Sequence, residues 1–274
     1  MYRLQYPELC AAAWLSALTI LGLATIGIAL PASANGSAAG SPIDLPLYAR
    51  ILEQHTEITD DTAGVRVDYR KIGSTPAWRD LVSQIEGAAP SRLDRDGQIA
   101  FWINVYNILT IDLILKHYPV ESIKDIGSFF SPVWDIDVAT IEGSTISLGD
   151  IEHKILRPMG EPRIHAAIVC ASASCPPLAR KPFRPDQLDQ DLSTAMRAWL
   201  RNSKKGIKID PGAGRITVSK IFDWFEGDFE ADGGVLEVIA RYIDPKDAEW
   251  LRANGQKASI QYFNYNWSLN DMKR

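Results

Sequence analysis

The chain has 274 residues, of which 46% are hydrophobic and 23% are charged. This composition is typical of a globular protein and excludes a disordered chain, a collagen-like repeat or a coiled coil as the main architecture. The formal net charge of −5 argues against a general electrostatic grip on nucleic acid, and the 3 cysteines exclude a disulfide-dense small scaffold.

The N-terminal segment is predicted to lie outside the fold. An apolar run over residues 10–30 is followed by Pro31 and by Ala32-Ser33-Ala34, the small-x-small pattern that signal peptidase reads. We expect residues 1–34 to be a signal peptide cleaved after Ala34, and residues 35–44 to be a spacer. The run is also long enough to span a bilayer, so an uncleaved anchor is the alternative. Both predict an exported protein, periplasmic or secreted.

Export changes how the cysteines are interpreted. Cys10 lies in the predicted signal peptide, which leaves Cys170 and Cys175 as the only cysteines of the exported part. Exported compartments are oxidising, so two nearby cysteines there can pair as a disulfide.

Residues 45–274 are predicted to form a single globular domain, because they contain no repeat of roughly 20–50 residues and no linker-like stretch. Helices are expected over 45–56 and over 76–86, the latter with Pro76 at its first position.

The strongest predicted element is a helix over residues 92–118. Ser91 is expected to cap it, with Asp94 completing a weak capping box. From Ile99 to Leu115 the helix is apolar almost all round, but three polar residues interrupt it and it is short for a membrane span. It is therefore expected to be a buried central helix. The three interrupting residues are Asn104, Asn107 and Asp112.

The remaining patterns alternate between helical and hairpin spacing. Because no regular βαβ unit occurs, the predicted class is α+β: one domain with a central buried helix and several flanking helices against a small, mainly antiparallel sheet built from hairpins. The predicted elements are a hairpin over 134–148, helical spacing over 148–156, a buried strand over 164–170, an amphipathic helix over 186–202, a hairpin pairing 207–209 with 216–218, helices near 234–243 and 245–253, and a strand near 260–265.

Reactive side chains are densest between residues 150 and 176. A thiol, an imidazole and a carboxylate are the parts of a nucleophilic site, because the imidazole activates the thiol and the carboxylate orients the imidazole. One hypothesis is therefore a thiol hydrolase or transferase in which Cys175 attacks an acyl or amide carbon. The candidate bases are His165 and His153, and the candidate orienting carboxylates are Glu152 and Asp150.

Other polar residues near these segments are candidates for binding. The small residues between the cysteines let backbone approach a ligand, with Ser172 and Ser174 among them. Asn104, Tyr106 and Asn107 lie on the buried helix. Its amides either brace neighbouring backbone or orient the base or substrate.

Two further hypotheses remain open. The first is a non-catalytic binding module of the cell envelope, whose loop is closed by a Cys170–Cys175 disulfide. The second is a zinc domain using these cysteines with His165 and His153, although their spacing fits no metal template. No metal and no cofactor are therefore predicted, and whether the protein is an enzyme stays open.

The sequence places few limits on the partner. A small molecule, a peptide or an envelope component is expected, with no nucleic acid, and with membrane contact only through an uncleaved N-terminal segment. The aromatic-rich stretches 222–225 and 262–267 are expected to pack within the domain, and a groove for a sugar or peptide is the alternative reading.

Several segments together resemble a known family, the bacterial and plant family catalogued as domain of unknown function 547. The resemblance covers roughly residues 65–245 in order and points to an exported bacterial member. It implies that the Asn-Tyr-Asn helix, His153, His165 and the Cys-Pro loop form one region, and it supplies no substrate. The segments are 101–107 (FWINVYN), 117–126 (HYPVESIKDI), 148–153 (LGDIEH), 163–165 (RIH), 170–178 (CASASCPPL) and 219–224 (SKIFDW).

Overall fold

The computed structural model describes residues 41–128 and 131–272. The predicted signal peptide and most of the predicted spacer lie outside the described residues. One hydrophobic core runs through the described part, with buried members from Ile43 to Leu269.

The chain begins with helices that surround a longer one. Both helices predicted near the N-terminus are confirmed, and a short β1–β2 hairpin and a short helix between them were not foreseen. The elements are α1 (Leu45–His55), β1 (Thr56–Ile58), β2 (Val65–Val67), α2 (Tyr69–Gly73), α3 (Pro76–Glu86) and α4 (Arg95–His117).

Helix α4 is the predicted central helix, and it is buried along most of its length. It is long and apolar enough to cross a membrane, yet it packs against α2 and α3 as a core helix of the domain does. The predicted cap was wrong. Asp94 caps the helix by accepting a hydrogen bond of 2.7 Å from the Gly97 N–H, whereas the Ser91 hydroxyl donates to Glu142. The reason is local: Leu93 is extended, so the helix cannot begin before Arg95.

Two hairpins are confirmed. β3 (Asp137–Ile141) pairs antiparallel with β4 (Ser144–Ser147), and Glu142 and Gly143 form the turn with φ values of 50° and 77°. β5 (Ile207–Asp210) pairs antiparallel with β6 (Arg215–Val218). The predicted C-terminal strand is shorter than expected, β7 (Ser259–Tyr262), and it adds to β6 in parallel.

The predicted strand over 164–170 is wrong. Residues Pro162–Ala166 form a 3-10 helix, η6, and the chain from 167 to 170 continues without regular structure. Pro162 at the first turn and the Glu161 side chain, which accepts from the Arg163 N–H, favour the helical start. The backbone beyond η6 stays buried because the Asn107 side chain supplies the hydrogen bonds that a neighbouring strand would supply.

The three helices predicted in the C-terminal half, over 186–202 and near 234–243 and 245–253, are confirmed as α5, α7 and α8, whereas α6 and η8 were not foreseen. The predicted amphipathic helix is α5, which buries Leu192, Met196 and Trp199 on one face. Their bounds are α5 (Leu188–Arg201), α6 (Ile221–Trp224), α7 (Val235–Ala240) and α8 (Pro245–Asn254), with a 3-10 segment η8 (Glu226–Asp232) between α6 and α7.

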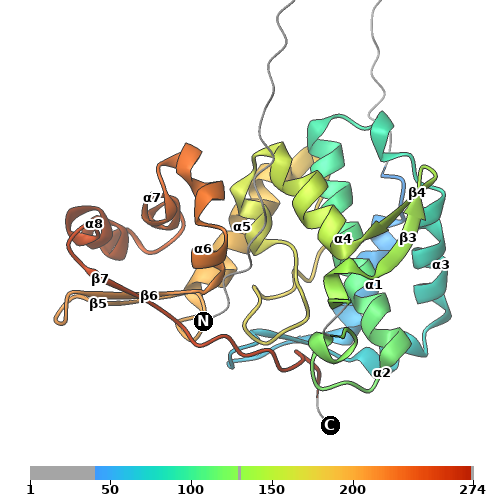
Figure 1. Ribbon diagram of the computed structural model, residues 1–274, viewed down its shortest axis with the longest axis horizontal. Coiled ribbons are helices and arrows are strands. Elements are labelled where there is room, and N and C mark those ends of the chain that lie inside the picture. Colours follow the sequence, from blue (N-terminus) through green and yellow to red (C-terminus); the bar gives the residue numbers. More distant parts are fainter. Residues whose placement is uncertain (1–40, 129–130, 273–274) are drawn as a thin grey trace, which may run out of the picture. The chain divides into compact units, whose positions relative to one another are not determined.

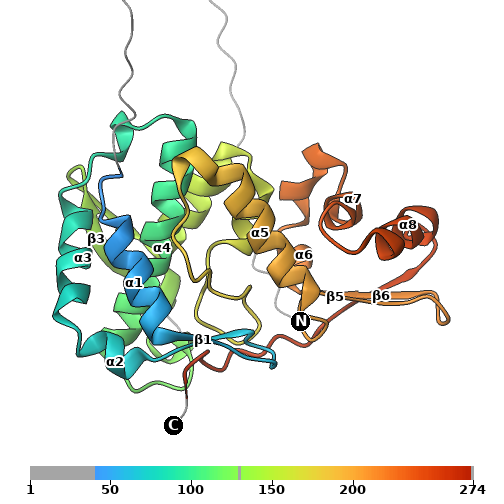
Figure 2. The same cartoon turned by 180° about the vertical axis from the view of Figure 1, so that it is seen from behind.

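The last described segment returns across the fold. After β7 the chain leaves the three-stranded sheet and runs back to the β1–β2 hairpin, as both views show (Figures 1 and 2). Met272 N donates to Val67 O over 2.9 Å, and Leu269 N donates to Glu121 O over 2.7 Å. This segment therefore joins elements from both halves of the sequence.

Candidate functional site

One side of the site is a π-helix. Residues Asp150–Leu156 form η4, directly after β4. The helical spacing predicted here is confirmed, and the π form is notable because short π segments occur often at functional sites. Asp150 stabilises the start of η4, since its carboxylate accepts hydrogen bonds from the Ser147 N–H and hydroxyl, both over 3.0 Å. That bonding gives Asp150 a structural role.

Glu152 projects from η4 into the interior. Glu152 is only 8% exposed, and its Oε2 lies 3.5 Å from the hydroxyl of Tyr106 on α4. Burial raises the pKa of Glu152 to about 7, while the positive charge of Arg157 acts in the opposite direction. Near neutral pH this carboxyl therefore exists in both protonation states.

The second side of the site is the cysteine loop. The sulfurs of Cys170 and Cys175 lie at disulfide distance, with 6.3 Å between the Cα atoms. Cys175 is 3% exposed, whereas Cys170 is half-buried. Three groups surround the Cys175 sulfur: the Cys170 N–H at 3.1 Å, the Ser172 hydroxyl at 3.3 Å and the Tyr265 hydroxyl at 3.2 Å.

The backbone of this loop is unusual and firmly held. Ala171 adopts a left-handed conformation with φ of 62°, which is strained for a residue with a β-carbon. Strained backbone of this kind is found often at functional sites. The following residues bond to the C-terminal segment: Ala173 N donates to Ser268 O over 2.8 Å, and the Ser174 hydroxyl accepts from Asn266 N over 2.8 Å. Ser174 thus braces the loop, while Ser172 faces the sulfurs.

A buried lysine holds the loop from beneath. Lys205 is 1% exposed, and its ammonium donates to the backbone carbonyls of Ala63, Ala173 and Cys175. Burial lowers the pKa of Lys205 to about 7, with the charge of Asp61 acting in the opposite direction. Sequence reasoning gave no signal for this residue, because it stands in an ordinary run of charged side chains.

Tyr265 joins the two sides. Its hydroxyl contacts both sulfurs and also interacts electrostatically with Glu152, and it influences the ionisation of Tyr106. Burial raises the pKa of Tyr265, so its hydroxyl stays protonated at neutral pH. Glu152, Tyr106, Tyr265, Cys170 and Cys175 thus form one group, here named the Glu–Tyr–Cys cluster. From the sequence, the stretch that contains Tyr265 was expected to pack within the domain, with a groove for a sugar or peptide as the alternative, and no contact with the cysteines was foreseen.

Aromatic rings surround Tyr265. Its ring lies 4.8 Å from that of Trp224 and 4.5 Å from that of Trp267, measured between centroids, and Trp134 contacts Trp267 at 5.8 Å. The packing expected for the two aromatic stretches is therefore what the structure has. Trp224 is 44% exposed, so this packed group also reaches the surface.

The histidines belong to a different network. His165 Nε2 lies 2.7 Å from Asp228 Oδ2, and Arg157 contacts the same carboxylate with two nitrogens, at 2.6 and 2.7 Å. His153 is exposed, and its Nδ1 lies 3.3 Å from Arg157. Although burial opposes it, hydrogen bonds from Arg157 and His165 lower the pKa of Asp228, while burial lowers the pKa of His165.

The expected thiol–imidazole pair is therefore not assembled. Within the described residues, the hydrogen bonds to the two sulfurs come from backbone, Ser172 and Tyr265, and none comes from a histidine. Asp228 could not be identified from the sequence as the partner of His165. It lies 63 residues further along the chain, in a segment with several acidic residues that no local pattern distinguishes.

The two buried amides of α4 brace backbone. Asn104 donates to Phe183 O over 2.8 Å and accepts from Phe183 N over 3.0 Å. Asn107 does the same with Ala167 O and Val169 N, at 2.9 and 2.8 Å. Both side chains bond backbone and not His165, so of the two alternatives stated for them, bracing is the one that the structure has.

The described part of the chain brings together no group of three or more His, Cys, Asp or Glu suited to a metal.

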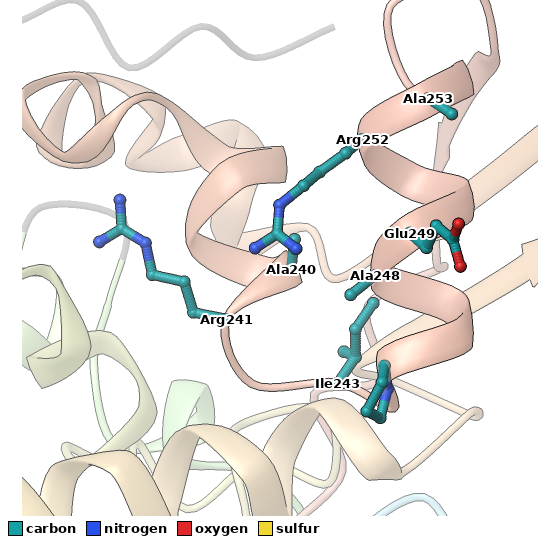
Figure 3. A pocket seen from close by; sticks show the side chains of 8 residues that line it. Ala240, Arg241, Ile243, Ala248, Glu249, Arg252 and Ala253 are labelled. Atoms are coloured by element: carbon teal, nitrogen blue, oxygen red, sulfur yellow. The ribbon is translucent and has the colours of Figure 1, made fainter.

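A surface pocket of about 690 Å³ lies between α7 and α8 and shares no residue with the Glu–Tyr–Cys cluster (Figure 3). Its two arginines are already paired, Arg241 with Asp232 at 3.4 Å and Arg252 with Glu237 at 3.3 Å.

The fold and the site define an α+β protein with a buried carboxyl beside a cysteine pair. Residues 90–200 match the family model described as "Protein of unknown function, DUF547", so the chain contains a DUF547 family domain. The match includes η4 and the cysteine loop, and it ends before Asp228 and Tyr265. No curated protein and no solved structure matches the chain.

Proposed function

We propose that the domain is an exported thiol–disulfide exchange protein, with Cys170 and Cys175 as its reactive pair. The observation that carries this proposal is the set of three hydrogen-bonding groups around the Cys175 sulfur. Hydrogen bonds to a thiolate favour the charged form, and a stabilised thiolate is a better leaving group in exchange. The predicted signal peptide, which delivers the pair to an oxidising compartment, agrees with this role.

The order of steps in the exchange depends on which of the two sulfurs a partner can reach. A thiolate of a partner dithiol attacks the sulfur of the half-buried Cys170, the Cys170–Cys175 bond breaks, and its electron pair leaves with Cys175 as a thiolate. The partner's second thiolate then attacks the partner sulfur of the mixed disulfide and releases Cys170. The partner dithiol is oxidised to a disulfide, and the pair is reduced to two thiols that take up the partner's two protons.

A second candidate is the non-catalytic binding module with a structural disulfide. It is favoured by the way Lys205 and the C-terminal segment hold the loop backbone. In that case replacing both cysteines by serine costs only stability, about 2 kcal/mol for so short a loop. The thiol hydrolase with Cys175 as nucleophile has less support, because within the described residues none of the hydrogen bonds to the Cys175 sulfur comes from a histidine.

A titration of the folded, oxidised protein with a reduced peptide dithiol separates these functions. An exchange site passes its disulfide to the peptide reversibly without denaturant, and Cys170→Ser abolishes the transfer. A structural disulfide stays oxidised until the protein is unfolded, which would overturn the proposal. A hydrolase would require Cys170→Ser, with Cys175 free, to cleave a thioester probe.

A further inference from the structure

We infer that Glu152 supplies the proton that Cys175 takes up when the disulfide opens and takes a proton back when the disulfide closes. The proton passes through the hydroxyls of Tyr106 and Tyr265. This inference rests on the proposed exchange function and adds the group that handles its proton. A leaving thiolate must be protonated to be stored as a thiol, and an attacking thiol must lose its proton, so a buried pair needs a nearby acid and base.

The geometry fixes both ends of a route from Glu152 to the sulfurs, and the step between the hydroxyls of Tyr106 and Tyr265 is what we infer. Its Oε2 lies 3.5 Å from the Tyr106 hydroxyl, and the Tyr265 hydroxyl lies 3.2 Å from the sulfur of Cys175 and 3.4 Å from that of Cys170. The two phenols interact electrostatically with each other and with Glu152. Both rings are packed, Tyr106 in the buried helix and Tyr265 against Trp224 and Trp267.

The charged and polar groups that face Glu152 come from four further segments. Arg157, which follows η4, favours the carboxylate, and Asp228 of η8 favours the neutral acid. Tyr106 of α4 donates its hydroxyl to the carboxylate, and Tyr265 approaches from the C-terminal segment. Burial outweighs Arg157 and sets the pKa at about 7, so either protonation state is reached at small cost near neutral pH.

The proton and the electrons balance in both directions. When a partner thiolate opens the disulfide, the electron pair of the broken bond goes to Cys175. In the neutral acid Glu152 becomes the donor in its contact with Tyr106. Glu152 gives its proton to Tyr106, Tyr106 passes its own to Tyr265, and Tyr265 passes its own to the Cys175 sulfur, which leaves a carboxylate beside Arg157. On reoxidation the same steps run backwards, and the carboxylate takes up the proton of the attacking Cys175 thiol.

The test is the pH dependence of disulfide opening in the full protein. Opening by dithiothreitol is followed by quenched alkylation and mass measurement between pH 5.5 and 8.5, with the rate constant expressed per dithiothreitol thiolate. For the native protein we expect this rate constant to fall as the pH rises through about 7, because Glu152 loses the proton it donates. Glu152→Gln should give a flat profile, about 100-fold below the native value at pH 6.

Two further variants keep the result interpretable. Glu230→Gln removes an exposed carboxylate two residues from Asp228 and should leave the profile unchanged. Tyr265→Phe breaks the hydroxyl chain and should flatten the profile as Glu152→Gln does, which decides the matter if Glu152→Gln does not fold. A native-like profile in either variant overturns the inference. If the native protein does not react with dithiothreitol without denaturant, the proposed exchange function itself fails.

Discussion

Glu152 is a carboxyl whose environment couples stability to pH. It lies among apolar and aromatic groups, with the Tyr106 hydroxyl 3.5 Å away as the hydrogen-bond donor to Oε2. Its pKa rises from 4.5 to about 7 on folding because burial penalises the charged form. The folded protein therefore binds more protons than the unfolded chain between these values, and stability falls as the pH rises through this range.

Removing that carboxyl should remove this pH dependence. Compared with the native protein, Glu152→Gln should gain stability on going from pH 4.5 to pH 8, by roughly 3 kcal/mol in the free energy of unfolding. Urea unfolding at the two pH values measures the difference, and contributions from Lys205 and other groups cancel because both proteins contain them. Glu230→Gln is the matched control, expected to follow the native curve. A Glu152→Gln curve parallel to the native one would show that the carboxyl is not shifted.

Lys205 is the second residue whose burial has a measurable cost. Its ammonium donates hydrogen bonds to three backbone carbonyls in the protein interior. Lys205→Met keeps most of the volume but leaves these carbonyls without their donor, and should cost about 2–3 kcal/mol at pH 6. Lys204→Met, at the exposed neighbouring position, should change stability by less than about 0.5 kcal/mol. Equal effects of the two substitutions in urea unfolding would contradict this account.

At the scale of elements, one carboxylate of η8 joins the segments that carry His165 and Arg157. Asp228 bonds His165 of η6 and Arg157 next to η4, so three short segments meet at this side chain. Short 3-10 and π segments have few internal hydrogen bonds, so side-chain pairs of this kind fix their relative positions.

Asp228→Asn should loosen these segments. We expect a loss of about 3 kcal/mol at pH 7, since Arg157 and the buried His165 lose their charged partner. The pKa of Asp228 is lowered in the folded state, so the stability it contributes is present above pH 3.8, its ordinary pKa, and disappears as the pH falls below it. Unfolding by urea at pH 7 and at pH 3 should therefore show a larger difference between native and variant at pH 7.

A surface carboxylate of the same segment provides the control. Asp232 pairs with Arg241 at 3.4 Å, and both side chains are about two-fifths exposed. Asp232→Asn should therefore cost less than about 1 kcal/mol at either pH. If it cost as much as Asp228→Asn, the effect would belong to η8 as a whole and not to the Asp228 network.

At the scale of the whole molecule, the C-terminal segment covers the cysteine loop. It contributes Tyr265 to the sulfurs and backbone hydrogen bonds from Asn266 to Asn270, and it ends on β2. Leu269 and Asn270 are buried, so this segment is part of the core although it is nearly free of regular structure.

Truncation after Phe263 should uncover the cysteine pair while keeping β7 in place. We expect a lower melting temperature and, at pH 8.5, where Glu152 has already lost its proton, at least a 10-fold faster opening of the disulfide by dithiothreitol, because the loop loses its cover and its backbone partners. Quenched alkylation measures the rate. A chain truncated after Met272 is the control and should behave as the native protein does. Unchanged opening in the shorter chain would show that the segment does not protect the pair.

Much of the fold was predictable because its signals are local. Pro76 at a first turn, the continuous apolar run of α4 and the period of two in the hairpins each depend on residues within one element. The errors arose where a local pattern has two solutions. The apolar run over 164–170 fits a buried strand, yet the Asn107 amide, 60 residues earlier, satisfies its backbone instead.

The sequence by itself determined the central helix, the β3–β4 and β5–β6 hairpins, the α+β class and the two stretches that hold Glu152 and the cysteine pair. Only the tertiary structure decided which side chains meet there. Tyr265 reaches the Cys175 sulfur from 90 residues away, and His165 finds its carboxylate partner, Asp228, 63 residues further along the chain. The periodicity of apolar residues shows which face of an element is buried. Which residues pack against that face depends on contacts between distant parts of the chain, and no local pattern in the sequence specifies them.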